Sequence, residues 1–455
     1  MNPAFVLGID GLPYTLVHKL VADGVMPNMS RLCHTGSLSQ MHTTIPDFSC
    51  VAWTSFATGV NPGKHGIYGF QDFHPTTAEA FMPDVTHCKT APLWHAVGEA
   101  GGRSIIINLP GTYPALPLRG KMVSGFVAPE FDKACYPPMF AQTLKTLGYK
   151  MDLDGNGGGL GTPAHVRECL WPVFEARKTT IRHVLENEYW DMCVAVITET
   201  DRLQHYFMHI LDDPNHADYE WVIRFYSELD AFIGEVADRL EGKAGLFMVS
   251  DHGFNVVRRE IILQDLLIEL ELMPNVAEPC WSSEEHLKKA KVLSLDPGRF
   301  YINRVNSRFK HGFVQADEEE EILTRIEDKL MSLHDPKTGE AMVSRIMRKD
   351  QAFWGETIDY APDLVAATNP GFYFRSFSHR ADENNTVYET KWEANHVWND
   401  AIVYTPYRVS NEIPPRIWDV FPSVLAYMGL DIAEELDGCD LARHAQSEET
   451  ADTVS

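Results

Sequence analysis

Short apolar runs recur along the chain and alternate with longer segments of helical periodicity. Runs of this kind are typical of strands buried on both faces of a parallel sheet. The runs expected to form strands are AFVLGI (4–9), SIIINL (104–109), CVAVIT (193–198), GLFMVS (245–250), DLVAAT (363–368) and AIVYT (401–405). The segments with a helical pattern are residues 17–24, 26–36, 164–188 and 221–242. The alternation predicts an α/β protein with a doubly wound, mostly parallel sheet.

Two regions interrupt the alternation and are expected to be insertions. Residues 115–162 are rich in Pro, Gly and aromatic residues and include DLDGNGGGLGTP, which predicts a lid-like segment. Residues 259–345 combine a predicted strand, RFYIN, with an acidic helix, and are expected to form an inserted cap subdomain. The predicted core is therefore discontinuous and comprises residues 1–114, 163–258 and 346–443.

Composition and charge narrow the class of partner. The 455 residues are 44% hydrophobic and 23% charged, as in an ordinary globular protein. The formal net charge of −25 argues against binding to a nucleic acid polymer or to an anionic membrane surface. We find no signal peptide, no membrane span and no CxxC pair among the eight cysteines, so a cytoplasmic protein is expected. The polar tail, 444–455, is expected to be disordered.

Acidic and imidazole residues follow the predicted strands. Asp10 comes after the first strand, Asp201 and His205 after CVAVIT, and Asp251 with His252 after GLFMVS. A further histidine, His396, precedes AIVYT. Because functional groups in a doubly wound sheet gather at the carboxyl ends of its strands, these side chains are expected to converge. Their chemistry predicts a site for more than one metal ion.

Local spacing is consistent with shared ions. Asp201 and His205 are four residues apart, so a helix would place them on one face. Asp251 and His252 are adjacent and can share an ion only if the strand turns there, which Gly253 would permit. Each of these acidic and histidine patterns is common in proteins without a metal. The metal site is predicted because the patterns occur together at the ends of successive strands.

The segment IPDFSCVAWTSFATG contains two candidate nucleophiles. Ser49 precedes a predicted helix that ends at Gly59, a position at which serine often acts only as an N-cap. The same position favours an anion, because free N–H groups and the helix dipole point toward it. Cys50 competes for the role, but a cluster of hard carboxylates suits an activated hydroxyl better, which favours Ser49. The absence of a GxSxG sequence disfavours a serine-esterase triad.

These residues resemble the alkaline phosphatase superfamily, specifically the type I phosphodiesterase/nucleotide pyrophosphatase family and its predicted phosphohydrolase/phosphomutase branch. The resemblance extends from about residue 4 to 440. The segments that carry it are GIDG, MPNMSRL, SCVAWTSFATGVNPGKHGI, TDRLQH, SDHGF and YAPDLVA. It implies an alkaline-phosphatase-like α/β fold.

The resemblance also implies a role for each site residue. One divalent ion would be held by Asp201, His205 and His396, and a second by Asp10, Asp251, His252 and the oxygen of Ser49. The ions would be Zn²⁺, with Mn²⁺ as the alternative, because mixed nitrogen and oxygen ligands suit either. Ser49 would attack phosphorus in line and form a phosphoserine intermediate.

Three positions depart from the family pattern. Nucleotide pyrophosphatases carry an asparagine after the HGI segment, where this chain has Phe70, and Gln71 or Lys64 are the substitutes considered. The usual GxH at the last histidine reads Ala394-Asn395-His396, and His379 is a rival ligand. Cys50 is not followed by the CxPxR sequence of sulfatases, which disfavours a formylglycine sulfatase.

The expected function is a two-metal phosphohydrolase that cleaves a small phosphate ester, diester or anhydride. The alternatives are a phosphonate C–P hydrolase, a phosphomutase-like transferase on the same site, and a non-catalytic relative that binds metal. The partner is expected to be a small phosphorylated substrate, with no nucleic acid polymer and no membrane; the oligomeric state stays open.

Overall fold

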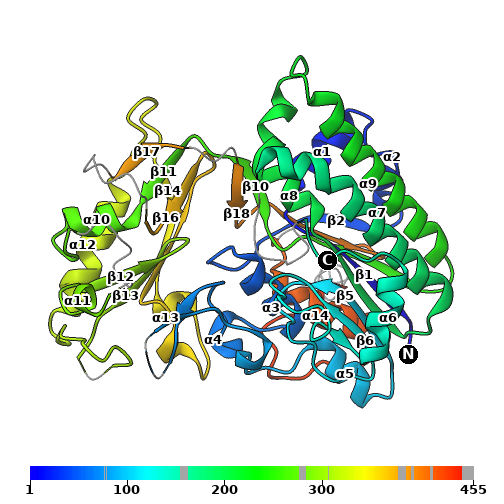
Figure 1. Cartoon of the computed structure of the whole chain (residues 1–455), viewed down its shortest axis with the longest axis horizontal. Helices are drawn as coiled ribbons and strands as arrows, with labels where there is room; N and C mark the ends of the chain where they lie inside the picture. The colour runs from blue at the N-terminus through cyan, green and yellow to red at the C-terminus, as the bar shows by residue number, and fades with distance from the viewer. Residues whose placement is uncertain are drawn as a thin grey trace, which may run out of the picture.

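The computed structural model describes residues 1–75, 77, 79–153, 162–275, 283–305, 307–377, 386–390, 394–409 and 413–442. The described chain forms two lobes that lie side by side (Figure 1). The larger lobe contains the long sheet and most of the helices, and the smaller lobe contains shorter sheets with a few helices. The N-terminus lies on the larger lobe.

The larger lobe is organised by an eight-stranded sheet in the order β2-β19-β9-β1-β8-β5-β6-β7. Its strands are β1 (Ala4–Ile9), β2 (Ser37–Met41), β5 (Ser104–Leu109), β6 (Gly120–Ser124), β7 (Cys135–Tyr136), β8 (Met192–Ile197), β9 (Gly245–Val249) and β19 (Ala401–Thr405). The five strands from β9 to β6 are parallel, whereas β19 and β7 are antiparallel to their neighbours. This is the α/β fold with a mostly parallel sheet that the alternating pattern predicted.

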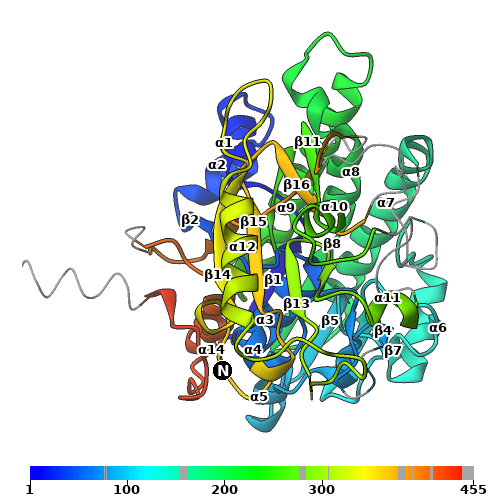
Figure 2. The same cartoon turned by 90° about the vertical axis from the view of Figure 1, so that its left-hand side faces the viewer.

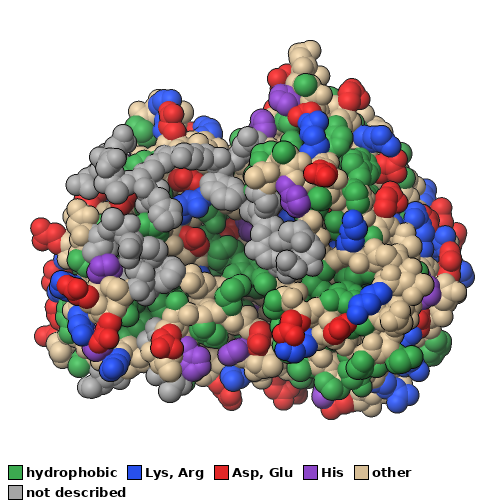
Figure 3. Space-filling view, viewed as in Figure 1, with side chains coloured by type: hydrophobic (Ala, Val, Ile, Leu, Met, Phe, Trp, Pro, Cys, Tyr) green, Lys and Arg blue, Asp and Glu red, His purple; other side chains and the backbone are tan. Residues whose placement is uncertain are grey.

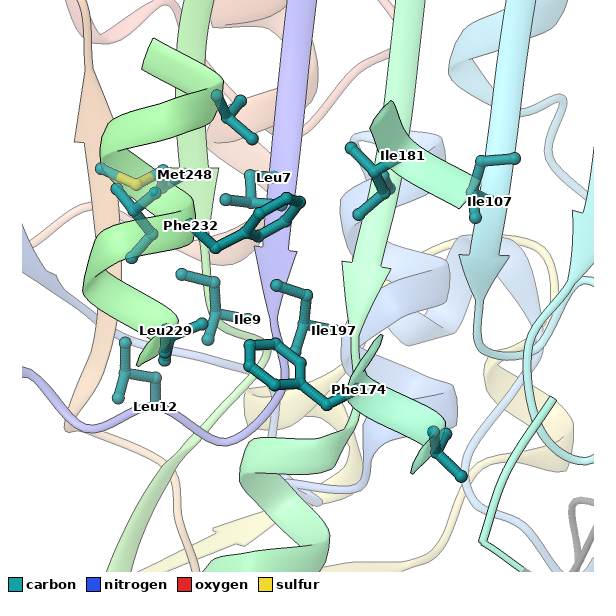
Figure 4. Close-up of a cluster of buried hydrophobic side chains, with 14 of the residues drawn as sticks. Leu7, Ile9, Leu12, Ile107, Phe174, Ile181, Ile197, Leu229, Phe232 and Met248 are labelled. Carbon is teal, nitrogen blue, oxygen red and sulfur yellow. The ribbon is translucent and has the colours of Figure 1, made fainter. Parts of the chain in front are cut away.

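Helices cover both faces of this sheet. One face carries α1 (Tyr14–Ala22), α2 (Pro27–Cys33), α6 (Pro138–Thr146), α7 (Pro163–Asn187) and α9 (Tyr219–Leu240), and the other carries α3 (Ser49–Thr58), α5 (Leu93–Glu99) and α14 (Val420–Met428). Successive residues of β1 point to opposite faces, so Leu7 and Ile9 enter one core whereas Val6 enters the other. In the first core, Phe174 of α7 and Phe232 of α9 pack onto the strands (Figure 4).

The smaller lobe is built from antiparallel and mixed sheets. Its strands are β11 (Arg259–Ile262), β12 (Val292–Leu295), β13 (Arg299–Ile302), β14 (Val343–Arg348), β15 (Leu364–Thr368), β16 (Phe372–Arg375) and β17 (Val387–Glu389). Its helices are α10 (Leu263–Glu269), α11 (Glu284–Leu287), α12 (Glu319–Met331) and α13 (Lys349–Ala352). Figure 2 shows α12 lying across the four-stranded sheet β12-β13-β15-β14. A separate apolar cluster fills the space between them.

The remaining elements lie between or beside these sheets. They are α4 (Pro62–His65), α8 (Glu199–Phe207), β3 (Asp72–Phe73), β4 (Ala80–Phe81), β10 (Gly253–Val256), β18 (Ala394–Val397) and the 3₁₀ turns Val85–His87, Met208–Asp212, Ile358–Tyr360 and Ile417–Asp419. The β10–β18 ribbon is antiparallel and pairs Phe254 with His396. In Figure 1 it lies between the two lobes.

Two expected strands of the parallel sheet are placed differently. Residues 363–368 form β15, but this strand belongs to the smaller lobe, where it pairs antiparallel with β13 and β14. Residues 401–405 form β19 of the large sheet, but the strand runs antiparallel to β9. An apolar run predicts that a strand is buried on both faces. It does not predict which sheet the strand joins or whether it runs parallel or antiparallel to its neighbours.

The expected insertions exchange strands with the core. Residues 115–162, predicted as a lid, supply β6 and β7 at the edge of the large sheet. Residues 346–443, predicted as core, supply β15 and β16 to the smaller lobe. Sheet membership therefore does not follow these boundaries, and the division into domains stays a prediction. The glycines in 154–161 and the tail 443–455 lie outside the described residues. None of the helices in the described part of the chain has the length and apolar character needed to cross a membrane.

Candidate metal centre

The parallel register of the central strands brings three acidic segments to one edge of the sheet. Ile9 of β1 pairs with Ile197 of β8, and Gly8 pairs with Val249 of β9, so the three strands end level with one another. Asp10, Asp201 and Asp251 follow these ends and are all buried. The backbone N–H of Gly11 donates to Asp251 Oδ1 at 3.0 Å, which ties the ends of β1 and β9 together.

The first cluster consists of Asp201, His205 and His396. Asp201 and His205 lie on one face of α8, and His205 Nε2 is 3.3 Å from Asp201 Oδ1. His396 arrives from β18, and its Nε2 is 3.4 Å from the same oxygen. One ligand atom from each residue lies within 4.8 Å of the others. The predicted i, i+4 pair therefore shares a face as expected, and the third group comes from a distant strand.

The second cluster consists of Asp10, Asp251 and His252, whose ligand atoms also lie within 4.8 Å of one another. His252 Nε2 is 3.2 Å from Asp251 Oδ2 and 3.8 Å from Asp10 Oδ1. The hydroxyl of Ser49 is 3.2 Å from the same nitrogen. The rings of His252 and His396 stack with centroids 3.6 Å apart, so the two clusters adjoin.

Several buried ligand atoms have no hydrogen-bond partner in the described chain. They are Asp10 Oδ1, Asp201 Oδ1, Asp251 Oδ2 and His396 Nε2. Leaving a buried polar atom without a partner costs about 1–3 kcal/mol, so a group of them in one place requires an explanation. Because each of these atoms belongs to one of the two clusters, divalent cations would satisfy all of them. The residues therefore fit a two-ion site.

Electrostatics point the same way. Burial, followed by repulsion from Asp251 and Asp201, raises the pKa of Asp10 well above its ordinary range. Burial raises the pKa of Asp251 to about 7. Burial also lowers the pKa of His252 well below its usual value, and the charge of His396 lowers it further. The Asp201–His396 pair behaves in the opposite way: despite burial, the neighbouring imidazoles hold the pKa of Asp201 well below its ordinary value, and contact with Asp201 raises the pKa of His396. Bound cations would favour the ionised form of Asp10 and Asp251 and the neutral form of the imidazoles.

The three imidazoles are oriented by backbone carbonyl groups. His205 Nδ1 lies 3.3 Å from the carbonyl of Ala394, His396 Nδ1 lies 3.1 Å from that of Asp47, and His252 Nδ1 lies 3.0 Å from that of Gly253. A carbonyl oxygen accepts a hydrogen bond from Nδ1–H, so each ring carries its proton on Nδ1 and Nε2 presents its lone pair to the cluster. This arrangement is typical of metal-binding histidines.

The two candidate nucleophiles on helix α3 line different cavities. Ser49 is its first residue and lines a cavity of about 240 Å³ that also includes Asp201, His205 and His396. Cys50 lines a different cavity of about 290 Å³ on the other side of the helix. Burial raises the pKa of Cys50 far above its ordinary value, so its thiol is a poor nucleophile. The helix ends at Gly59, where φ is 69°, as predicted.

The cavity beside Ser49 has an aromatic wall and a polar wall. The aromatic residues are Phe48, Phe70 and Phe126, and the polar residues are Arg202, Asp296, Tyr373, Arg375 and Asn395. Arg202 forms ion pairs with Asp152 at 2.7 Å and with Asp201 at 2.9 Å. Arg202 was not predicted as a site residue, although its position in TDRLQH, directly after the ligand candidate Asp201, was a usable signal. Arg375 pairs with Glu260 at 2.8 Å, which no sequence spacing indicates.

Some expectations at the site take a different form. Gly253 opens β10 without a left-handed conformation, and a Cβ at this position would lie 2.7 Å from Asp400. The glycine therefore permits a close approach to Asp400 and not a tight turn. Lys64 forms an ion pair with Asp437 at 2.7 Å, and neither Lys64 nor Gln71 lines the cavity. Phe70 does line it, and His379 lies outside the described residues.

The surface near the site is mixed in charge. On the face shown in Figure 3, basic and acidic side chains intermix around the notch between the lobes, and the described residues form no continuous basic surface there.

A doubly wound sheet that gathers buried carboxylate and imidazole groups beside a serine is the architecture of alkaline-phosphatase-like hydrolases. The family model for type I phosphodiesterase / nucleotide pyrophosphatase matches residues 4–395. The chain therefore belongs to this family, in the alkaline phosphatase superfamily, and is an enzyme, a phosphoric ester hydrolase. The family is metal-dependent, typically with two ions. Comparison with curated protein sequences gives no match.

Solved structures confirm the fold. Phosphonoacetate hydrolase from Sinorhizobium meliloti, in complex with phosphonoformate, is similar with a TM-score of 0.63 and 17% identity over 94% of this chain and 95% of that chain. Murine ectonucleotide pyrophosphatase / phosphodiesterase 5, an inactive form in complex with AMP, has a TM-score of 0.57 and 12% identity over 98% and 99%. The human counterpart has a TM-score of 0.58 and 11% identity over 98% and 99%.

Proposed function

We propose that the protein is a two-metal phosphohydrolase that uses Ser49 to cleave a small phosphate ester, diester or anhydride. The observation that carries the proposal is the convergence of two ligand clusters on one serine. Each cluster holds its ligand atoms within 4.8 Å, and Ser49 Oγ lies 3.2 Å from His252 at their junction. The chain's net charge and the absence of a predicted membrane helix are compatible with a small, freely diffusing substrate.

Asp201, His205 and His396 would hold one ion, and Asp10, Asp251, His252 and Ser49 the other. Zn²⁺ suits this mixture of nitrogen and oxygen ligands, and Mn²⁺ is the alternative. When bound, such a pair supplies Lewis acidity that lowers the pKa of the Ser49 hydroxyl and offsets charge on the leaving oxygen.

The chain itself prepares Ser49 for attack. The serine is the first residue of α3, so the free N–H groups and positive dipole end of the helix favour negative charge on Oγ and on the phosphoryl group. Oγ gives up its proton to solvent and forms a bond to phosphorus while the bond from phosphorus to the leaving oxygen breaks, and the leaving oxygen takes up a proton from solvent. Water then attacks the phosphoserine: its oxygen bonds to phosphorus, the bond from phosphorus to Oγ breaks, and Oγ regains a proton. The product is phosphate, or a phosphate monoester when the substrate is a diester.

A specific observation keeps phosphonate hydrolysis as the second candidate. Arg375 and Arg202 both line the cavity, and a guanidinium group is suited to a carboxylate such as that of phosphonoacetate. Both are already ion-paired, Arg375 with Glu260 and Arg202 with Asp152, and the carboxylate of Asp296 shares the cavity. A carboxylate on the substrate would therefore meet arginines whose charge is already neutralised by ion pairs. This favours an ester with a neutral leaving group as the substrate.

Paired variants of adjacent residues test the proposal. Ser49→Ala should lower the turnover of p-nitrophenyl phosphate and bis-p-nitrophenyl phosphate by about 10³-fold or more, because it removes the attacking oxygen. Cys50→Ala, the matched control, should retain most activity, because the thiol faces another cavity. Both variants should bind metal and fold. Activity retained by Ser49→Ala, or lost only in Cys50→Ala, would move the nucleophile. A metal-loaded wild-type enzyme with no turnover on esters or phosphonates would favour the non-catalytic reading.

A further inference from the structure

A second cavity lies on the other side of the segment that leads to Ser49. It has a volume of about 190 Å³ and lies where the two lobes meet. His42, Trp418 and Arg416 contribute from the larger lobe, and Arg345 on β14 contributes from the smaller one. Trp398, which follows β18, also lines the cavity. We call this cavity the arginine–tryptophan pocket.

The lining of this pocket carries two guanidinium groups and no carboxylate. Within the described residues neither Arg345 nor Arg416 forms an ion pair, although the charge of Arg416 opposes the burial that raises the pKa of Asp419, which lies outside the lining. This is unusual in a chain with 64 acidic and 39 basic residues, in which an arginine meets acidic neighbours easily. Burial lowers the pKa of His42, and the charges of Arg345 and Arg416 lower it further. Two guanidinium groups that face one cavity with no carboxylate in its wall favour an anion.

The aromatic residues hold the arginines in place. The Arg345 guanidinium lies 5.3 Å from the ring centre of Trp398, and that of Arg416 lies 5.6 Å from the ring of Trp418. Stacking of this kind orients a guanidinium and leaves its N–H edge available for an oxyanion. The buried hydroxyl of Thr43, which also lines the pocket, has no hydrogen-bond partner within the described residues. This hydroxyl is therefore a further hydrogen-bond donor that a ligand in the pocket could use.

The walls also indicate the shape of the ligand. Ile45, Pro62, Met347 and Ala352 line the remainder of the pocket beside Trp354. A bare anion would leave this apolar surface in contact with water, whereas a planar or apolar group next to the anion would cover it. The volume accommodates one ring with one tetrahedral group.

We propose that the arginine–tryptophan pocket binds a small molecule that carries a phosphate or phosphonate group beside a planar ring. Arg345, Arg416 and Thr43 bind its oxygens, and the ring packs against Trp354 and the aliphatic wall. The proposal does not depend on the proposed function of the metal centre, because the two sites share no residue. The pocket nevertheless adjoins that centre: the N–H of Thr43 donates to the carbonyl of Trp398, and the carbonyl of Asp47 is paired with His396.

Isothermal titration with phenylphosphonate tests the proposal on the full chain. The double variant Arg345→Gln/Arg416→Gln should bind one phenylphosphonate fewer per chain than the wild type, or bind it at least about tenfold more weakly at that site. Both arginines are exposed, so the variant should fold, which its thermal melting will show. The control Arg103→Gln/Arg119→Gln removes the same charge from two exposed arginines outside the pocket and should bind as the wild type does. Unchanged binding in the first variant, or an equal loss in the control, would overturn the proposal.

Two further arms identify the ligand group and separate this site from the metal centre. Asp251→Asn, which disables the metal centre, should still bind one phenylphosphonate per chain, and loss of all binding in it would assign the ligand to that centre alone. Benzyl alcohol, which has the ring without the anion, should not bind measurably; equal binding would refute an oxyanion site. Inorganic phosphate should bind more weakly than phenylphosphonate, and equal affinity would remove the ring from the proposal.

Discussion

Replacement of Asp251 by asparagine should have opposite effects on stability with and without metal. In the metal-free protein the buried carboxylate adjoins Asp10, and burial raises its pKa from the ordinary 3.8 to about 7. A pKa difference of about three corresponds to about 4 kcal/mol of folding free energy lost when the group is forced to ionise. Asparagine has no charge to ionise, and its carbonyl can still accept the Gly11 N–H bond that Asp251 accepts at 3.0 Å.

The sign follows from the two protonation states. Below about pH 3 the carboxyl is neutral in both the folded and the unfolded chain, so it contributes no pH-dependent difference. As the pH rises from there toward 7 only the unfolded chain ionises, and above pH 7 the penalty on the fold is complete. Metal-free Asp251→Asn should therefore have a free energy of unfolding up to about 4 kcal/mol higher than the metal-free wild type at pH 8, and should match it near pH 3.

With Zn²⁺ or Mn²⁺ at about 10⁴ times its dissociation constant the order should reverse. At that excess an ion stabilises the fold by about 5.5 kcal/mol, which exceeds the gain of up to about 4 kcal/mol in the metal-free variant, and the variant should lose this stabilisation at the second cluster. Urea denaturation in EDTA and in excess metal, with metal content by mass spectrometry, measures both effects. Asp230→Asn is the matched control, since this buried carboxylate accepts three hydrogen bonds from Asn28 and Met29. It should destabilise the protein in both conditions. A metal-free Asp251→Asn variant that is less stable than wild type at pH 8 would refute the reasoning.

Three further predictions concern the metals and the substrate. Because Asp251 must be ionised to bind a cation and its pKa is about 7, metal affinity should fall by up to about tenfold per pH unit below pH 7; constant affinity from pH 7.5 to 5.5 in chelator competition would contradict this. Arg375→Gln should raise the KM for phosphonoacetate by about tenfold if that compound is a substrate, and change the kcat/KM for p-nitrophenyl phosphate by less than about threefold. Arg202→Lys retains the charge but loses the fork that joins Asp152 to Asp201, so kcat and metal content should both fall, by about tenfold for kcat, in steady-state assays and metal analysis; unchanged values would show that the fork is dispensable.

The centre of the fold could be predicted because its strands are buried on both faces. β1, β5, β8 and β9 are continuous apolar runs of five or six residues, and this short length favours strands where periodicity alone cannot exclude a buried helix. The edge strand β2, SLSQM, alternates buried and exposed positions and contains no such run. β15 is as apolar as a core strand but joins the smaller lobe, because sheet membership depends on partners distant in the sequence.

The site shows the same division. Asp10, Asp201 and Asp251 could be predicted to converge, because each follows a parallel strand and the strands end together. The carboxylate cluster favoured Ser49 over Cys50 on chemical grounds, but the direction of each side chain could not be predicted: adjacent residues of a helix point about 100° apart, and only the surrounding structure shows which direction meets the metal clusters. Arg375 depends on Glu260 and on the course of β16, and neither leaves a local pattern.

Anomalous diffraction from crystals grown with Zn²⁺, recorded at the zinc edge, tests the central claim most directly. The account predicts two peaks per chain, one among Asp201, His205 and His396 and the other among Asp10, Asp251, His252 and the oxygen of Ser49. A single peak, or peaks outside these two clusters, would contradict it.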